Sequence, residues 1–162
     1  MQDRLQAAEL FAGLDAVRLA RLNAIARGLT LRNGDYLFLL GDTAQYISVV
    51  LSGLVDLCLP ISIDDVVKDI TVEAVGPGKT IGWSALVKPF RFTLSARAAA
   101  PTEILAFERL ALEQVFSTDP TIERVIRNGI SELMASRLTM FQALWARELQ
   151  RTLSPGGQDT QA

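Results

Sequence analysis

Residues 76–98 decide the fold of this chain, and they are Gly-Pro-Gly-Lys-Thr-Ile-Gly-Trp-Ser-Ala-Leu-Val-Lys-Pro-Phe-Arg-Phe-Thr-Leu-Ser-Ala-Arg-Ala. The pattern predicts a turn at Gly76-Pro77-Gly78, a short strand, one helical turn opened by Gly82, a loop and a further strand. Gly82 allows the backbone to come close to a ligand, and Ser84-Ala85-Leu86 can present free N–H groups to an anion. The segment therefore predicts a backbone cradle for a small anion.

Short apolar and β-branched segments surround this cradle and predict an antiparallel barrel or jelly roll. They recur about every 8–12 residues and are separated by turn signals such as Asn33-Gly34 and Ser52-Gly53. The polar stretch 62–69 is predicted to form a hairpin tip. The predicted strands are 29–31, 36–40, 47–51, 55–59, 70–75, 93–98 and 102–107.

The strands are preceded by a segment with helical periodicity, residues 5–26. Gly13 is predicted to break this segment into two short helices. Asp15 is the expected N-cap of the second helix, and Gly28 is expected to end it.

A second helical region follows the strands. Residues 110–116 predict one short helix, and Asp119-Pro120 then offers an N-cap followed by proline at the first helical position. Helical periodicity continues to about Leu153, which predicts a helix about 45–50 Å long.

This long helix carries two apolar stripes. One stripe is expected to pack on the chain's own barrel and the other on a partner helix, so we expect a homodimer; the alternative is a monomer that folds both stripes back on its barrel. Gly129 is expected to mark a crossing or bending point. The first stripe consists of Ile126, Ile130, Leu133, Arg137, Met140, Leu144 and Arg147. The second stripe consists of Met134, Leu138, Phe141, Trp145 and Leu149.

The pattern divides the chain into three expected segments. Residues 1–118 are predicted to be the β-rich domain with its N-terminal helices. Residues 119–153 are predicted to be the dimerisation helix, and residues 154–162 a disordered tail.

Composition excludes several classes of function. The 162 residues include no histidine, which removes Ser-His-Asp catalysis, most zinc sites and a histidine-ligated haem. We therefore expect no enzyme, no metal and no obligatory cofactor. The net charge of −2 argues against a general nucleic-acid binder. No apolar run approaches the roughly 18 residues of a membrane span, and the N-terminus lacks a signal-peptide pattern, so we expect a cytoplasmic protein without a membrane partner.

Two single residues are expected to be structural. Cys58 lies between leucines and is expected to be a buried, small hydrophobe; as the only cysteine it excludes an internal disulfide and favours a reducing compartment. Arg97 is expected to pair with Glu103 or Asp56.

The order and spacing of several short motifs resemble the cyclic-nucleotide-binding domain family, in particular the sensor domain of catabolite-activator and fumarate-reductase-regulator proteins. The resemblance implies a mainly β fold, a double-stranded β-helix or jelly roll, with N-terminal helices and a long C-terminal helix. The motifs are Leu10-Phe11-x-x-Leu14, Gly34-Asp35-Tyr36-Leu37-Phe38, Gly41-Asp42, Ser52-Gly53-Leu54-Val55, Gly76-Pro77-Gly78, Gly82-x-x-Ala85-Leu86 and Ser95-x-Arg97-Ala98.

The resemblance also implies a ligand site, the phosphate-binding cassette. In members that bind cyclic AMP or cyclic GMP, a Glu after the glycine takes the ribose hydroxyl, and an Arg pairs with the cyclic phosphate. Here Trp83 holds the Glu position and Phe92 the Arg position, with Arg91 one residue earlier. Phe90 and Phe92 flank Arg91 and are expected to face the core. The predicted cassette is Gly82, Trp83, Ser84, Ala85, Leu86, Arg91, Phe92 and Thr93.

These substitutions predict a non-catalytic regulatory protein with a diverged cassette. Its expected partners are a small anionic or planar molecule, or an effector protein. The alternative is a genuine receptor for cyclic AMP or cyclic GMP that uses Arg91 and the cassette amides. Trp83 is expected either to stack on a planar ligand or to fill a pocket that has lost one. The related transcription regulators continue into a helix-turn-helix domain after the long helix; since this sequence stops there, no direct DNA binding is expected.

Overall fold

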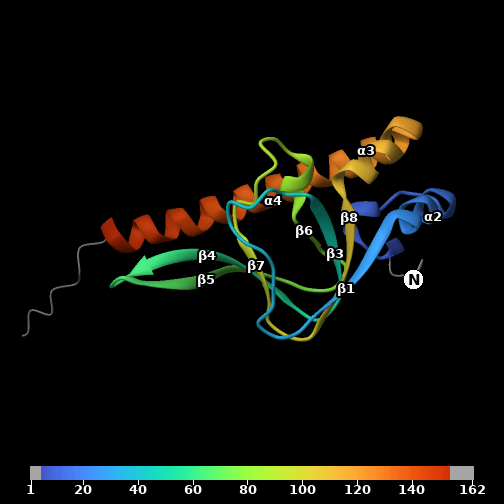
Figure 1. Cartoon of the computed structure of the whole chain (residues 1–162). Helices are drawn as coiled ribbons and strands as arrows, with labels where there is room; N and C mark the ends of the chain where they lie inside the picture. Colours follow the sequence, from blue (N-terminus) through green and yellow to red (C-terminus); the bar gives the residue numbers. More distant parts are fainter. Residues whose placement is uncertain (1–4, 154–162) are drawn as a thin grey trace, which may run out of the picture. The chain divides into compact units, whose positions relative to one another are not determined.

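The computed structural model describes residues 5–153, and in sequence order its strands come after two short helices and before two further helices (Figure 1). The first elements are a short 3-10 helix, η1 (Glu9–Phe11), and α2 (Ala16–Ile25). The Asp15 side chain caps α2 by accepting a hydrogen bond from the Arg18 N–H, as predicted. Gly28 does not end this helix: α2 stops at Ile25 and β1 begins at Ala26, because the chain turns directly into a strand that pairs with β8.

The strands form two four-stranded antiparallel sheets, which confirms the predicted jelly-roll class, although the two sheets are not closed into one continuous barrel. The first sheet has the order β1 (Ala26–Leu31), β8 (Thr102–Glu108), β3 (Tyr46–Ser52) and β6 (Thr80–Ile81). The second has the order β2 (Tyr36–Phe38), β7 (Ser95–Ala98), β4 (Val55–Ile63) and β5 (Val66–Val75).

The hydrophobic core draws on both sheets. Val50, Ile81 and Ile104 come from the first sheet, and Val55, Leu57, Val75 and Ala96 come from the second. All seven are buried, and burial of such apolar side chains is the main favourable term in folding.

The predicted hairpin tip at residues 62–69 was too long. The strands β4 and β5 continue pairing up to Ile63 and Val66, so that only Asp64 and Asp65 form the turn. Both have positive φ angles, 50° and 61°, a conformation that Asp tolerates better than most residues. The polar residues of this stretch suggested a loop, but residues 62–63 belong to β4 and residues 66–69 to β5.

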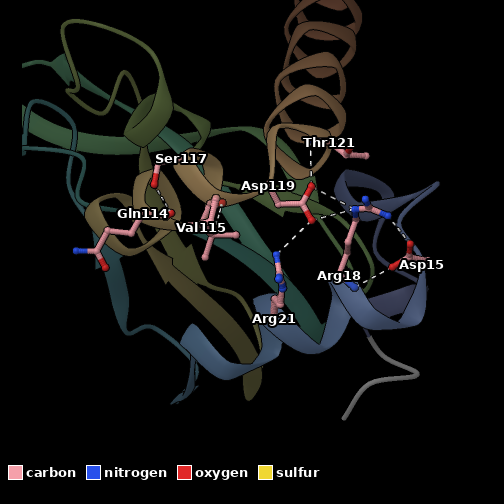
Figure 2. A network of polar contacts seen from close by, with 9 residues as sticks. Asp15, Arg18, Arg21, Gln114, Val115, Ser117, Asp119 and Thr121 are labelled. Carbon is pink, nitrogen blue, oxygen red and sulfur yellow. Dashed lines mark hydrogen bonds and ion pairs between the residues drawn. The ribbon is translucent and has the colours of Figure 1, made fainter.

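Two helices follow the sheets, α3 (Arg109–Thr118) and α4 (Pro120–Leu153). Asp119 lies between them and links three helices (Figure 2). Its Oδ1 accepts a hydrogen bond from the Thr121 N–H at 3.1 Å, and its Oδ2 accepts from Arg18 Nε at 3.1 Å and from Arg21 Nη1 at 3.4 Å. The predicted cap is therefore present, and the two arginines of α2 hold it.

The described residues fall into two compact units that meet within α4, between Gly129 and Ile130. In the first unit, the beginning of α4 buries Ile122 and Ile126 completely. A Cβ at Gly129 would lie 3.2 Å from Leu10 Cδ1, so this glycine allows a close approach between α4 and Leu10 of the same chain. In the second unit, the helix exposes a series of large apolar side chains: Met134, Leu138, Phe141, Leu144, Trp145, Leu149 and Leu153. The predicted tail, 154–162, lies outside the described residues.

Replacing Asp119 tests the junction between the helices. Asp119→Ala removes both the cap of α4 and the two ion pairs, and we expect it to lower the free energy of unfolding by about 2 kcal/mol. Asp119→Asn keeps a capping oxygen and should cost less than about 1 kcal/mol, because ion pairs with partly exposed arginines contribute little. Urea denaturation followed by circular dichroism measures both values, and equal losses in the two variants would contradict the dominance of the cap.

Candidate functional site

The cassette begins where β6 ends. Gly82 has a φ of +76°, in the left-handed region, and it precedes η2, a 3-10 turn over Trp83–Leu86. The Ala85 N–H donates to the Gly82 carbonyl at 3.0 Å, and the Val87 N–H donates to the Ser84 carbonyl at 3.3 Å. The first N–H groups of such a turn have no acceptor within it, and their use for an anion stays a prediction.

Both the positive φ angle and the lack of room for a Cβ atom favour glycine at position 82. A Cβ at this position would lie 2.8 Å from the Tyr46 carbonyl oxygen and 3.4 Å from the Phe92 ring. Ser84, Ala85 and Leu86 are buried, and Trp83 is half-buried. The short turn is therefore packed tightly against β3 and against the far end of the cassette.

Phe92 fills the position at which the resemblance places the phosphate-binding arginine. It is only 7% exposed, and its ring stacks on Phe38 with the ring centroids 3.6 Å apart and the planes 8° from parallel. The Phe92 N–H donates to the Asp42 carbonyl, and the Phe92 carbonyl accepts from the Gly41 N–H. An apolar aromatic pair thus packs behind Gly82, where a binding member of the family would need a cation.

Arg91 is exposed, and its guanidinium is engaged with the opposite loop. Its Nη1 donates to the Gly41 carbonyl at 2.8 Å, and the residue pairs in β-bridge fashion with Thr43. Thr93 is also exposed. The structure therefore brings Gly82, Phe92 and Phe38 together and leaves Arg91 and Thr93 at the surface.

Phe90 departs from the expectation that it faces the core. It is half-buried and has a φ of +59°, and the Arg109 guanidinium lies over its ring, 4.2 Å from the centroid. Such cation–π contacts are worth about 0.5–2 kcal/mol. The Phe90 carbonyl also accepts from the Ala44 N–H at 2.8 Å. Because Arg109 is the first residue of α3, this contact links the cassette loop to the helices that follow.

Sequence reasoning missed Phe38, and it did not anticipate the contact between Phe90 and Arg109. Phe38 lies in a predicted strand, but nothing local distinguishes it from other strand aromatics. Its partner is 54 positions away in the sequence, and only the fold places the two rings in contact. The alternation of Phe90 and Phe92 around Arg91 predicted that both of these rings face the core, and the prediction was correct for Phe92 only.

Several polar side chains of the second sheet pair with one another. Arg97 Nη2 lies 4.0 Å from Asp56 Oδ2, so that the second of its two expected partners is the correct one. The Tyr36 hydroxyl donates to Asp69, and this bond raises the pKa of Tyr36. Cys58 is completely buried, as predicted, and burial raises the pKa of its thiol.

Residues 5–153 offer no metal or membrane-spanning site. No group of three or more Cys, Asp or Glu side chains is arranged to hold a metal ion in this part of the chain. None of the helices described combines the length and the apolar composition that a membrane crossing requires.

The packing behind Gly82 can be tested by adding a single methyl group. Gly82→Ala should lower the free energy of unfolding by more than about 2 kcal/mol, because it meets both an unfavourable φ and the Tyr46 carbonyl. Gly34→Ala is the matched control, since Gly34 also has a positive φ but open space around it; it should cost only about 1–2 kcal/mol. Thermal and chemical denaturation compare the two, and a Gly82→Ala variant as stable as the control would contradict the close packing.

Comparison with known proteins identifies the family. A family model described as "Cyclic nucleotide-binding domain" matches residues 29–119, more than half of the chain. A search of curated proteins found no match.

Solved structures share the fold over most of the chain. A putative cyclic nucleotide-binding protein from Geobacter metallireducens is 26% identical with a TM-score of 0.71, and the alignment covers 84% of this chain and 96% of that one. The N-terminal domain of a transcriptional regulator from Streptomyces coelicolor is 27% identical with a TM-score of 0.70, over 86% of this chain and 95% of that one. The Thermus thermophilus catabolite activator protein is similar in fold, with 24% identity and a TM-score of 0.71 over 89% of this chain and 63% of that one. From the matched residues, the two-sheet architecture and the glycine-opened turn together, we conclude that the chain belongs to the cyclic nucleotide-binding domain family.

Proposed function

We propose that this chain is a non-catalytic regulatory module whose diverged cassette does not bind cyclic AMP or cyclic GMP in the usual way. The observation that carries this proposal is the stack of Phe92 on Phe38. A buried ring at the arginine position leaves no cation there for a cyclic phosphate, and making room for the ligand would require the pair to separate.

Trp83, which stands where the resemblance places a Glu, is also expected to weaken cyclic nucleotide binding. Trp83 has an N–H donor but no carboxylate, so it cannot accept a hydrogen bond from a ribose hydroxyl. A hydrogen bond to a charged group contributes about 1.5–3 kcal/mol, which corresponds to at least tenfold in affinity. Loss of the carboxylate and of the arginine together should weaken cyclic nucleotide binding by at least about a hundredfold.

The alternative function is a genuine cyclic nucleotide receptor. Its support is the intact glycine-opened turn, whose geometry still suits an anion. Arg91 would have to exchange the Gly41 carbonyl for the phosphate. This exchange is sterically accessible because Arg91 is exposed.

A regulatory module must pass a change at its ligand site to another part of the protein. Here the cassette loop contacts the first residue of α3 through Phe90 and Arg109. Movement of the loop would disturb the contact between Phe90 and Arg109, and hence the start of α3. A ligand or protein that binds one loop conformation better than the other would shift the population between them. Since α3 leads through Asp119 into α4, the C-terminal helix is the proposed output element.

We further propose that the module is a homodimer joined by its C-terminal helices, with residues 119–153 as the dimerisation segment. The large apolar side chains exposed between Met134 and Leu153 support this assembly. In a two-fold contact the same stripe lies on both chains, so an apolar helix can cover itself. Most of these side chains belong to the second stripe, and Leu144 belongs to the first, whose near-heptad spacing suits a helix pair; Ile126 of the first stripe is already buried within the chain.

Calorimetric titration tests the ligand proposal. Wild-type protein should bind cyclic AMP and cyclic GMP more weakly than micromolar, for the reasons of charge and space given above. The double substitution Trp83→Glu with Phe92→Arg restores both family groups and should tighten binding at least about tenfold. Submicromolar binding of either nucleotide by the wild type would refute the proposal and establish the receptor function.

Light scattering tests the dimer. Wild-type protein at micromolar concentration should have twice the 17.7 kDa mass of the chain. Leu133→Glu with Leu144→Glu places charge in the first stripe and should give folded monomers. Thr139→Glu with Gln150→Glu adds the same charges at exposed positions outside both stripes and should leave the dimer intact. A wild-type monomer would contradict the proposed assembly.

A further inference from the structure

The strand β1 forms an open edge of the first sheet. It is the outermost strand of that sheet, and it pairs with β8 over six consecutive residues without a register shift. Among the described residues of the first unit, no other strand pairs with β1. Proteins often block such an edge with a proline, a bulge or a very short strand, and β1 has none of these. Its free side can therefore accept a further strand.

The backbone groups on this free side belong to Gly28 and Thr30. Val50 of β3 exchanges backbone hydrogen bonds of 3.0 and 2.8 Å with the turn before β6, so its backbone faces away from β8. In an antiparallel sheet, backbone direction alternates along each strand and from one pair to the next. Ile104, which pairs with Val50, therefore directs its backbone to Leu29 of β1. The neighbours of Leu29 on either side direct their N–H and C=O groups away from the sheet.

The side chains along β1 leave room for this further strand. Residues 27–30 are all exposed, and Leu29 remains 43% exposed although it pairs with the fully buried Ile104. A Cβ atom at Gly28 would meet no atom within 4 Å. A strand added at this edge would cover Leu29 on one face of the sheet and the open space at Gly28 on the other. Free backbone groups beside an exposed apolar side chain are what recognition by strand addition requires.

The free charges beside β1 are positive. Residues 16–34 contain four arginines and no acidic residue. Asp119 binds the two arginines of α2. The guanidinium groups of Arg27 and Arg32 form no ion pair with any residue that the structure describes. Two copies of β1 placed side by side would bring these cations together, which disfavours self-pairing and favours an acidic partner.

We propose that the β1 edge binds an extended segment of another protein as a fifth strand of the first sheet, and that this segment carries an apolar residue two positions from an acidic one. The spacing follows from Leu29 and Arg27, which lie two positions apart and so share one face of β1. The inference gives the expected effector protein a docking site. It depends neither on the ligand of the cassette nor on the dimer.

Affinity and selectivity have different sources in this contact. The backbone groups of Gly28 and Thr30 would bond to any extended chain, so they supply affinity without sequence preference. Leu29 and Arg27 lie between the hydrogen-bonded pairs, where side chains on adjacent strands come closest. An apolar residue opposite Leu29 and a carboxylate opposite Arg27 are therefore the side chains that this edge selects.

Fluorescence anisotropy on the full chain tests the proposal with a labelled peptide, Ser-Glu-Ser-Val-Ser-Glu-Ser. The peptide places its valine and both glutamates on one face, and its symmetry suits either strand direction. It should bind saturably, and the same peptide with lysine in place of both glutamates should bind at least about tenfold more weakly. Equal binding of the two peptides, or no saturable binding of the acidic one up to about 1 mM, would overturn the proposal.

Substitutions at the edge show where the peptide binds. Gly28→Pro removes an outward N–H and leaves the bonds to β8 in place, since an edge strand tolerates proline where its nitrogen faces solvent. It should weaken binding of the acidic peptide at least about tenfold. Gly28→Ala is the matched control: it keeps the N–H, has space for its methyl group and should bind like the wild type.

Reversing one charge gives a test that does not depend on the proline variant. Arg27→Glu should bind the lysine peptide more tightly than the glutamate peptide, and an unchanged preference would overturn the proposal. Circular dichroism and the melting temperature verify that each variant is folded.

Light scattering separates this contact from an association between copies of the chain. Gly28→Pro should leave the mass of the wild-type assembly unchanged, because β1 lies outside the proposed helix pair. A lower mass would show that a second copy occupies the edge, and the acidic partner would then be refuted. A wild-type monomer would refute the dimer alone.

Discussion

The contact on which the site depends is the stack of Phe92 on Phe38 behind Gly82. It joins β2, the turn after β6 and the loop before β7, three segments far apart in the chain. Around it, the Phe92 backbone pairs with Asp42 and Gly41, and Arg91 binds the Gly41 carbonyl. The loop that should be open to a ligand is thus held at its base by an apolar pair and at its rim by hydrogen bonds.

A second junction connects the cassette loop to the rest of the chain. Arg109 contacts the Phe90 ring at the beginning of α3, and Asp119 caps α4 at the end of the same helix. Arg18 and Arg21 of α2 bind that carboxylate. The helix α3 is thus held at one end by the cassette loop and at the other by a charged cap.

Local sequence patterns predicted the fold because its turns and helix caps are formed by residues close together in the sequence. Turn residues such as Gly34 and Gly53 separate the strands, and Asp15 and Asp119 cap helices within two or three residues of themselves. The extent of β4 and β5 was missed because pairing across a hairpin stabilises polar strand residues that alternation alone does not reveal. Arg91 and Phe92 contact residues about 50 positions away in the sequence, Gly41 and Phe38. These contacts depend on how the cassette loop aligns with the opposite loop, which local patterns do not reveal. The sequence therefore located Trp83 and Phe92 in the predicted cassette, but it did not reveal that Phe92 stacks on Phe38.

Cys58 gives the chain a chemical property that concerns its role as a sensor. Its side chain is inaccessible to solvent, and burial raises its thiol pKa. Oxidants and electrophiles react with the thiolate, and they need access to it. Because the chain has no other cysteine, its folded form offers no accessible thiol for disulfide exchange. A thiol–disulfide signal therefore has no direct point of attack on the folded domain, and peroxide would act first on an exposed methionine such as Met134.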